Sequence, residues 1–187
     1  AKGRVMTLID GVAQPFVADL GGDSGMWDLQ QIEVYRGPQS TSNGRNSIGG
    51  SVFIKTKDPS QDWEGAARVG YRNQDQYIDT SGVISGPLVE DTLAFRLSVQ
   101  HLDADTITDD TGYDPNPPDY DLDEIKTTRI RGKLLWTPSD DLSFMLTHTY
   151  NDEAGDTGRI FYALENLDDR ERIYFRDIET EASTTTL

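Results

Sequence analysis

Residues 36–59 of the chain are RGPQSTSNGRNSIGGSVFIKTKDP. This stretch opens with a Gly-Pro turn signal and continues through small, polar residues to a pair of glycines. It then becomes a short apolar strand at residues 51–54, and a proline ends it. The pattern suits either a phosphate-binding loop or a small polar domain that folds inside a larger structure.

The phosphate-binding interpretation fails on the residues that follow the glycines. Gly44 and Gly49 have the spacing of a Walker A loop, but that motif needs a lysine where Gly50 stands and a helix after it. The sequence instead predicts a strand after Gly50. We therefore expect the glycines to form a turn that leads into a buried strand.

Composition narrows the classes of function. The 187 residues suffice for one ordinary domain or for parts of two. A formal net charge of −16 argues against nucleic-acid binding, which needs clustered Lys and Arg to neutralise phosphates. The absence of cysteine excludes disulfides, thiolate metal sites and thiol nucleophiles. Neither His101 nor His148 can be assembled into a Ser-His-acid set, so we expect neither an enzyme nor a cofactor.

The first sixty residues are irregular and rich in glycine. They contain short predicted strands at residues 5–9, 32–35 and 52–56, and Asp10-Gly11 is a turn signal. Residues 26–31 are predicted to form a helical turn, with Ser24 as a weak N-cap.

From Trp63 onward the apolar residues alternate strictly with polar ones. Leu97 and Val99 share one face of a predicted strand, for example, while Arg96 and Gln100 share the other. Similar alternation runs through residues 128–136 and 142–150, and two weaker strands are predicted at residues 66–72 and 77–85. Period-two alternation over this length predicts antiparallel strands with one apolar and one polar face.

The lengths of the connections add a second signal. Residues 86–91 and 137–141 are short, whereas the connections that begin near residues 104 and 154 are long. The tight turns then fall at one end of the sheet and the longer connections at the other, as in an outer-membrane β-barrel. The alternative is a soluble antiparallel sheet with one wet face, which gives the same alternation.

Residues 30–58 resemble the end of the plug domain of TonB-dependent outer-membrane receptors. The resemblance rests on the strand Ile32-Glu33-Val34, the Arg36-Gly37-Pro38 turn, Gly44, the glycine pair Gly49-Gly50 and the apolar strand that ends in Thr56-Lys57. Ser42-Asn43 departs from the family, which usually has an apolar residue and Tyr there. The implied fold is mainly β: the first five or six strands of an antiparallel barrel, preceded by part of a small α+β plug.

The resemblance implies the following organisation. Residues 1–60 would be the C-terminal half of the plug, and residues 61–187 the first strands and extracellular loops of the barrel. We expect the chain to be a fragment, with the TonB-contacting segment before Ala1. The family imports scarce nutrients across the Gram-negative outer membrane, most commonly ferric siderophores. Cobalamin, haem and glycans stay open as ligands, and a soluble β-rich binding module stays open as a different class of function.

Three groups of residues are candidates for the site. The resemblance places Gln14, Pro15 and Phe16 at the plug apex, where Phe16 would either contact ligand or pack on the barrel wall. Glu33 and Arg36 are expected to form charge-assisted bonds within the plug or to the barrel. Arg96, Arg129, Arg131 and Lys133 would face the lumen, either to pair with carboxylates or to attract an anionic ferric chelate.

The acidic stretch at residues 103–124 invites a calcium-binding interpretation. Asp119, Asp121 and Asp123 begin like an EF-hand loop, but Glu124 replaces the required glycine and Ile130 stands where the bidentate glutamate belongs. We therefore predict no metal site and interpret the stretch as a solvated loop.

Overall fold

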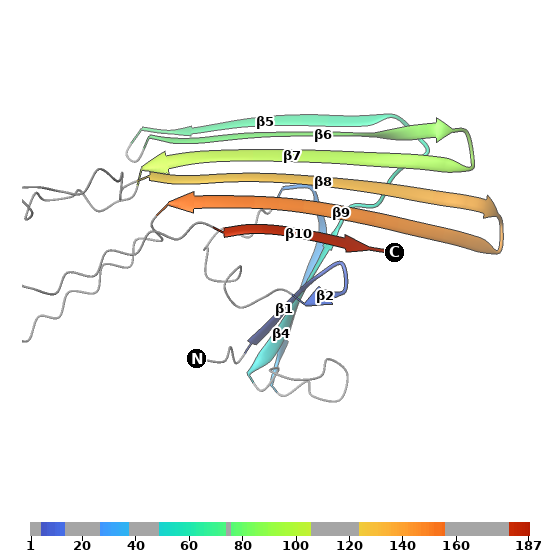
Figure 1. The fold of residues 1–187 in the computed structure, drawn as a ribbon, viewed down its shortest axis with the longest axis horizontal. Helices are drawn as coiled ribbons and strands as arrows, with labels where there is room; N and C mark the ends of the chain where they lie inside the picture. The colour runs from blue at the N-terminus through green and yellow to red at the C-terminus, as the bar shows by residue number, and fades with distance from the viewer. Residues whose placement is uncertain (1–4, 14–26, 38–48, 74–75, 106–123, 156–179) are drawn as a thin grey trace, which may run out of the picture.

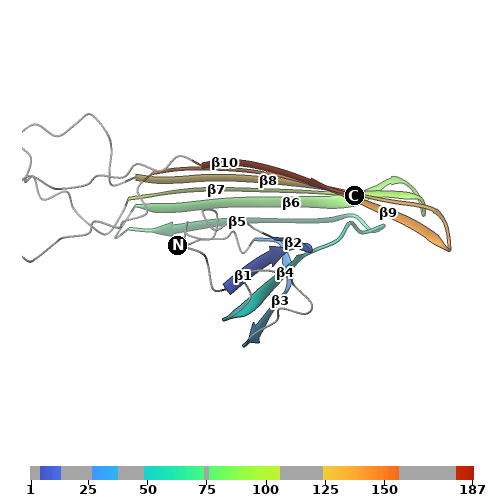
Figure 2. The same cartoon turned by 60° about the horizontal axis from the view of Figure 1, so that its bottom comes forward.

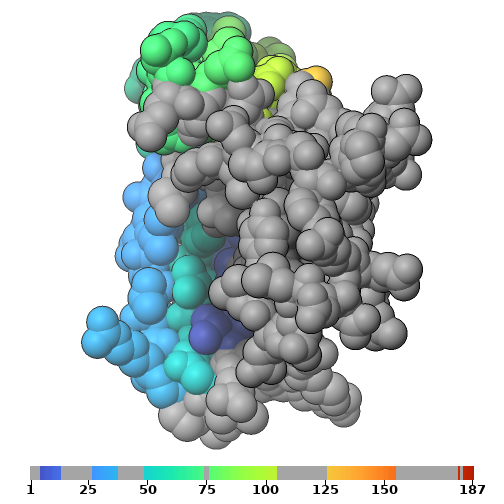
Figure 3. Space-filling view, turned by 90° about the vertical axis from the view of Figure 1, so that its left-hand side faces the viewer, coloured from blue at the N-terminus to red at the C-terminus, as the bar shows by residue number. Residues whose placement is uncertain are grey.

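The computed structural model describes residues 5–13, 27–37, 49–73, 76–105, 124–155 and 180–187. These residues form two β-sheets, and within them no helix is long and apolar enough to cross a membrane. Figures 1 and 2 show a large sheet of long strands with a small sheet packed against one of its faces. In the end-on view of Figure 3 the small-sheet strands, blue and cyan, lie below the green strands of the large sheet.

The small sheet has four strands in the order β2-β1-β4-β3. Their bounds are β1 Val5–Ile9, β2 Val12–Ala13, β3 Leu29–Arg36 and β4 Gly50–Thr56. Strand β1 runs parallel to β4, and the other two pairs are antiparallel. The buried residues of β4 include Ser51 and Thr56 as well as Ile54, so the core of this sheet is small and partly polar.

Two turn features of the small sheet follow directly from residue type. Asp10 and Gly11 both have positive φ, of 47° and 82°, which matches the two-residue turn of a tight hairpin and confirms the predicted turn. Gly50 has φ of 142°, and a Cβ atom there would lie 2.4 Å from the Tyr35 carbonyl oxygen. Only glycine therefore allows β4 to begin this close to β3.

The predicted helical turn at residues 26–31 is wrong over its described part. Trp27 and Asp28 form a turn, and strand β3 begins at Leu29. Asp28 has φ of 60°, which a helix does not allow. Pairing of β3 with β4 outweighs the weak local helix signal.

The large sheet is an antiparallel meander in which each strand pairs with its neighbours in sequence. Its strands are β5 Glu64–Arg72, β6 Tyr77–Val89, β7 Leu93–Asp105, β8 Glu124–Ser139, β9 Leu142–Gly155 and β10 Thr180–Thr186. The five strands that alternation predicts are present as β5–β9, and β10 is a sixth strand to which the sequence analysis assigned no range. We call this sheet the wall and the four-stranded sheet the plug sheet.

The β6–β7 and β8–β9 turns of the wall lie at the right-hand end in Figure 1, as the connection lengths predicted. They are shorter than expected, because β6 continues to Val89 and β8 continues to Ser139. The ladder shifts register between Pro87 and Val89 and again beside Pro138. A proline lacks the N–H that a regular ladder needs, so it is tolerated where a bulge interrupts the pairing.

The two faces of the wall have opposite polarity. Its outer face exposes large apolar side chains, including Ile84, Leu97, Val99, Ile130, Leu134, Trp136, Phe144 and Leu146. The face toward the plug sheet buries polar and charged ones, including Asp79, Ser81, Ser85, Arg96, Ser98, Gln100, Thr127, Lys133 and Thr147. This arrangement is the inverse of a water-soluble sheet, in which the covered face is apolar.

Candidate functional site

The interface between the wall and the plug sheet is held by two clusters of opposite charges. Each cluster joins side chains of the wall to carboxylates that precede or follow strands of the plug sheet. We call them the Asp28 cluster and the Lys133 cluster.

The Asp28 cluster lies at the turn before β3. The Arg96 guanidinium donates from Nη2 to Asp28 Oδ1 at 2.5 Å and from Nε to Oδ2 at 2.8 Å, a bidentate pair in which both side chains are at least 95% buried. Arg131 Nη2 lies 3.5 Å from Asp28 Oδ2 and donates to the carbonyl oxygens of Trp27 and Asp28 at 3.3 Å. Arg96 also pairs with Glu64 at 3.1 Å. Two wall arginines thus hold one turn of the plug.

Trp27 extends the same contact toward β5 and β6. Its indole Nε1 donates to the Gly82 carbonyl oxygen at 3.2 Å. The Arg68 guanidinium carbon lies 5.0 Å from the centre of the Trp27 ring, within the range of a cation–π contact. Arg68 is oriented by an ion pair with Asp79 on the neighbouring wall strand. The turn at residues 27–28 therefore contacts several wall strands at once.

The Lys133 cluster joins two separate parts of the plug to one wall lysine. Lys133 Nζ lies 3.2 Å from Asp10 Oδ2 and 3.1 Å from Asp58 Oδ1, and the Thr56 carbonyl oxygen is 3.5 Å away. Asp10 in turn accepts hydrogen bonds from the backbone N–H and the hydroxyl of Thr56 at 2.9 and 2.6 Å. Lys133 is 97% buried, so these carboxylates supply the compensation that its charge requires.

Asp58 is the more exposed acid of this cluster. Burial by itself raises its pKa, but the hydrogen bonds and attraction from Lys133 and then Lys55 outweigh burial and leave the pKa below its usual value of 3.8. Asp58 stays ionised at neutral pH and can bind both lysines.

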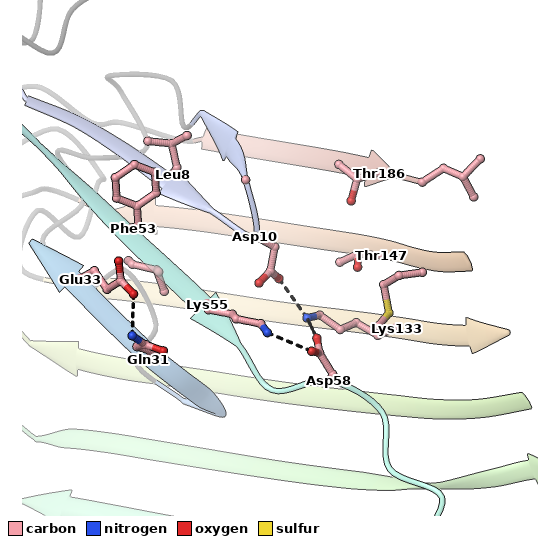
Figure 4. Close-up of a pocket in the computed structure, with 14 residues that line it drawn as sticks. Leu8, Asp10, Gln31, Glu33, Phe53, Lys55, Asp58, Lys133, Thr147 and Thr186 are labelled. Carbon is pink, nitrogen blue, oxygen red and sulfur yellow. Dashed lines mark hydrogen bonds and ion pairs between the residues drawn. The ribbon is translucent and has the colours of Figure 1, made fainter. Parts of the chain in front are cut away.

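A cavity of about 490 Å³ lies beside the Lys133 cluster, between the plug sheet and strands β8–β10. Figure 4 shows Lys133 and Asp58 pointing toward each other, with Gln31 and Glu33 on the opposite side. The cavity is lined by both polar and apolar side chains. Among the residues that the structure describes, no group of three or more His, Cys, Asp or Glu could hold a metal ion.

The structure places three of the four predicted lumen residues in these two clusters. Arg96 and Arg131 contact Asp28, and Lys133 contacts Asp10 and Asp58. Arg129 points to the same face but pairs within the wall, with Asn151 at 2.8 Å and Glu153 at 2.5 Å.

Glu33 and Arg36 are each expected to form charge-assisted bonds within the plug or to the barrel, and the structure shows such bonds within the plug for Glu33. Glu33 accepts hydrogen bonds from Gln31 and Tyr35 of its own strand, at 2.6 and 2.7 Å. Neither Glu33 nor Arg36 forms an ion pair with another residue of the described part of the chain. Gln14, Pro15 and Phe16 lie outside the described residues.

Sequence reasoning missed the three aspartates that the wall binds. Asp10 was recognised only as a turn residue, Asp28 fell in the predicted helical turn, and Asp58 was only the acid before a proline. A local signal existed for Asp10 alone, since it precedes a glycine in a hairpin turn. The partners of Asp28 lie 68 and 103 residues away in sequence, so local pattern cannot identify them.

Comparison with known proteins follows this division of the chain. Residues 1–51 match the family model described as the TonB-dependent receptor plug domain. The chain is 31% identical over 138 residues to the pesticin receptor of Yersinia pestis, covering 73% of this chain and 19% of that protein. It is 26% identical over 137 residues to a probable TonB-dependent siderophore receptor, PirA, of Acinetobacter baumannii, covering 68% and 18%. The chain therefore spans about a fifth of the length of these relatives.

A solved structure shares the arrangement of both sheets. The outer-membrane ferripyoverdine receptor of Pseudomonas aeruginosa superposes with a TM-score of 0.73 at 20% sequence identity, over 96% of this chain and 24% of that one. The likeness confirms the predicted fold, in which wall strands of an outer-membrane receptor barrel follow plug strands.

Proposed function

We propose that this chain, which matches the plug-domain model over residues 1–51 and shares the fold of an outer-membrane receptor, is part of a receptor that imports a ferric siderophore. The family consists of transport receptors rather than enzymes, and its members lie in the outer membrane of Gram-negative bacteria. The proposal has three parts: the transported ligand is a ferric siderophore, the receptor contacts TonB, and this protein lies in the outer membrane.

The observation that carries the proposal is the inverted polarity of the wall. Its apolar face is exposed, and its charged face is covered by the plug sheet. Exposed apolar side chains on successive strands suit contact with lipid acyl chains, whereas buried Arg96 and Lys133 suit a lumen that a plug fills. A soluble binding module would expose the charged face instead, so this alternative is the weaker one.

We assign residues 1–60 to the plug and residues 61–187 to the barrel. The change from one sheet to the other between Thr56 and Glu64 supports this boundary. Energy from TonB would reach the plug through its N-terminal side. The two charged clusters would keep the plug seated until that force acts.

The siderophore class is supported by the names of the relatives. One is a probable siderophore receptor, and the structural neighbour contains bound ferripyoverdine. The apex residues Gln14, Pro15 and Phe16 remain our candidates for ligand contact. Replacing Phe16 by Ala in the complete receptor should weaken binding of the ferric chelate by about 1–3 kcal/mol, without changing receptor abundance.

Uptake in whole cells tests the proposed function. A strain that lacks the complete gene should lose uptake of at least one ⁵⁵Fe-labelled siderophore under iron limitation, and a strain without TonB should show the same loss. Uptake of labelled cobalamin serves as the matched control for substrate class. Loss of cobalamin uptake with intact iron uptake would contradict the siderophore assignment. A gene product that stays in the soluble fraction and migrates identically before and after heating would contradict the receptor itself.

A further inference from the structure

Strand β8 presents three cations to the covered face of the wall, and they do not have the same partners. Arg131 and Lys133 both reach carboxylates of the plug. Within the described part of the chain, Arg129 is bound only by the neighbouring wall strand β9. Its role is therefore not explained by the clamping of the plug sheet.

The guanidinium of Arg129 is only partly satisfied. Its Nε donates to Asn151 Oδ1 at 2.8 Å, and its Nη2 donates to Glu153 Oε1 at 2.5 Å. Asn151 Nδ2 also donates to Glu153 Oε1, at 3.1 Å, which fixes the carboxylate in place. The remaining nitrogen, Nη1, is buried and has no hydrogen-bond partner, and it is the one such side-chain atom found among the described residues.

A buried, unpaired guanidinium nitrogen is costly. The Nη1 nitrogen of a guanidinium carries two N–H donors, and each needs an acceptor. Native proteins rarely leave buried donors unpaired, because the group loses its bonds to water and gains none in return. Asn151 Oδ1 and Glu153 Oε1 already accept from Nε and Nη2, and no acceptor of the described residues reaches Nη1, so an oxygen from outside the cluster is its natural partner.

The height of Arg129 on the wall indicates where that partner would come from. Arg131 touches the plug at Trp27 and Asp28, and Arg129 lies two residues farther from the tight turn that ends β8, roughly 7 Å along the strand. It pairs across the ladder with Gln100 and Asn151, so polar side chains flank it on both neighbouring strands. In the proposed receptor this end of the strands leads to the extracellular side.

We propose that Arg129 is a ligand-binding residue, whose Nη1 donates to an anionic oxygen of the transported ferric chelate. The inference rests on the proposed siderophore function. Glu153 already neutralises the positive charge of Arg129. Selectivity for the chelate would therefore come from a short, charge-assisted hydrogen bond rather than from long-range attraction. Catecholate or carboxylate oxygens at the surface of a chelate fit this donor.

Binding of chelates with different charge to the complete, purified receptor tests the assignment. The probes are ⁵⁵Fe-labelled ferric enterobactin, a tris-catecholate anion, and ferrioxamine B, which carries a free ammonium group and is cationic. Arg129→Gln should weaken binding of the anionic chelate by about tenfold and change binding of a cationic one by less than about threefold. Arg129→Lys should recover only part of the loss, because lysine lacks the second guanidinium nitrogen.

Arg68→Gln is the matched control. Arg68 also faces the plug and also pairs with a wall carboxylate, Asp79, but it is not among the residues with an unpaired buried nitrogen. Arg68→Gln should leave unchanged the ratio of the receptor's affinities for the anionic and the cationic chelate. Two outcomes would overturn the role of Arg129 and leave the proposed function standing. One is an equal loss of affinity for anionic and cationic chelates in Arg129→Gln. The other is equal affinity of wild type and Arg129→Gln for an anionic chelate. The proposed function fails separately, since a strain that lacks the gene would then keep uptake of every labelled siderophore.

Discussion

Lys133 and Asp10 lie 3.2 Å apart, from Nζ to Oδ2, although one belongs to wall strand β8 and the other to the turn between β1 and β2. The same lysine also binds Asp58, which follows the last strand of the plug sheet. One buried wall residue therefore holds the end of β1 and the connection to the barrel at the same time.

Replacing Lys133 by Met should loosen the plug. The change leaves Asp10 and Asp58 without their shared cation in a largely covered interface, and we expect a loss of about 3 kcal/mol in the free energy of unfolding of the complete receptor. Sensitivity of cells to a large hydrophilic antibiotic should rise, measured at equal receptor abundance. Lys55→Met is the control, because Lys55 is 54% exposed and its pair with Asp58 should contribute at most about 1 kcal/mol. Equal antibiotic sensitivity of Lys133→Met and wild type would argue against a clamping role.

Arg96→Ala should be more damaging than Arg96→Lys, and both should be destabilising. The alanine leaves Asp28, whose side chain is 1% exposed, as an unpaired buried carboxylate, with an expected cost of about 3–5 kcal/mol. Lysine keeps the charge but loses the bidentate geometry. Denaturant unfolding of the purified receptor measures both. Adding Asp28→Asn to Arg96→Ala should recover part of the stability, and a purely additive double mutant would show that the two side chains are not coupled.

The ion pair of Asp58 predicts a pH dependence with a definite sign. Its folded pKa lies below the unfolded value of 3.8, so its contribution to stability is present above about pH 4 and is lost as the pH falls through the lower, folded pKa. Solvent screening keeps this contribution small, because the side chain is 41% exposed. Comparing unfolding of wild type and Asp58→Asn across pH 2–5 isolates it. The stability difference between them should shrink toward acid, and a difference that grows toward acid would reverse the assignment.

Gly50→Ala should destabilise the plug without touching the wall. The new Cβ would lie 2.4 Å from the Tyr35 carbonyl oxygen, a backbone atom that cannot move independently of β3, and φ at this position is 142°. We expect a cost of about 1–3 kcal/mol, together with faster protease cleavage of the plug. Gly11→Ala tests φ strain alone, because φ is positive there too but no atom lies within 4 Å of the added Cβ. A protease rate at or below that of Gly11→Ala would show that the clash is relieved.

Leu97 and Arg96 should report opposite environments although they are adjacent. Leu97 is 43% exposed on the apolar face, whereas Arg96 is 5% exposed under the plug. Arginine at position 97 should cost about 2–4 kcal/mol if the site lies near the middle of the bilayer. Because the native chain has no cysteine, single cysteines can be labelled without background. In intact membranes, a water-soluble reagent should label Leu97→Cys more slowly than a cysteine in an exposed loop. Equal labelling rates would place this face in water.

The sequence by itself determined five strands of the wall and the polarity of their faces. Alternation of side chains is a local property, so residues 93–99 indicate which side of their strand is apolar without knowledge of any partner. The Asp10-Gly11 turn and Gly50, which begins β4, are local in the same sense, because backbone angles depend mainly on the residue itself. The family resemblance at residues 30–58 likewise needed only neighbouring residues.

Only the tertiary structure decided which charges meet. Sequence reasoning placed Arg96 and Lys133 on the covered face but could not choose Asp28, Asp10 and Asp58 from 33 acidic residues. Those choices depend on the packing of the plug sheet against the wall, which brings together residues more than 65 positions apart. The same packing separates Arg129 from its neighbours on β8, because Arg131 reaches the plug turn while Arg129, two residues along the strand, pairs with β9 instead.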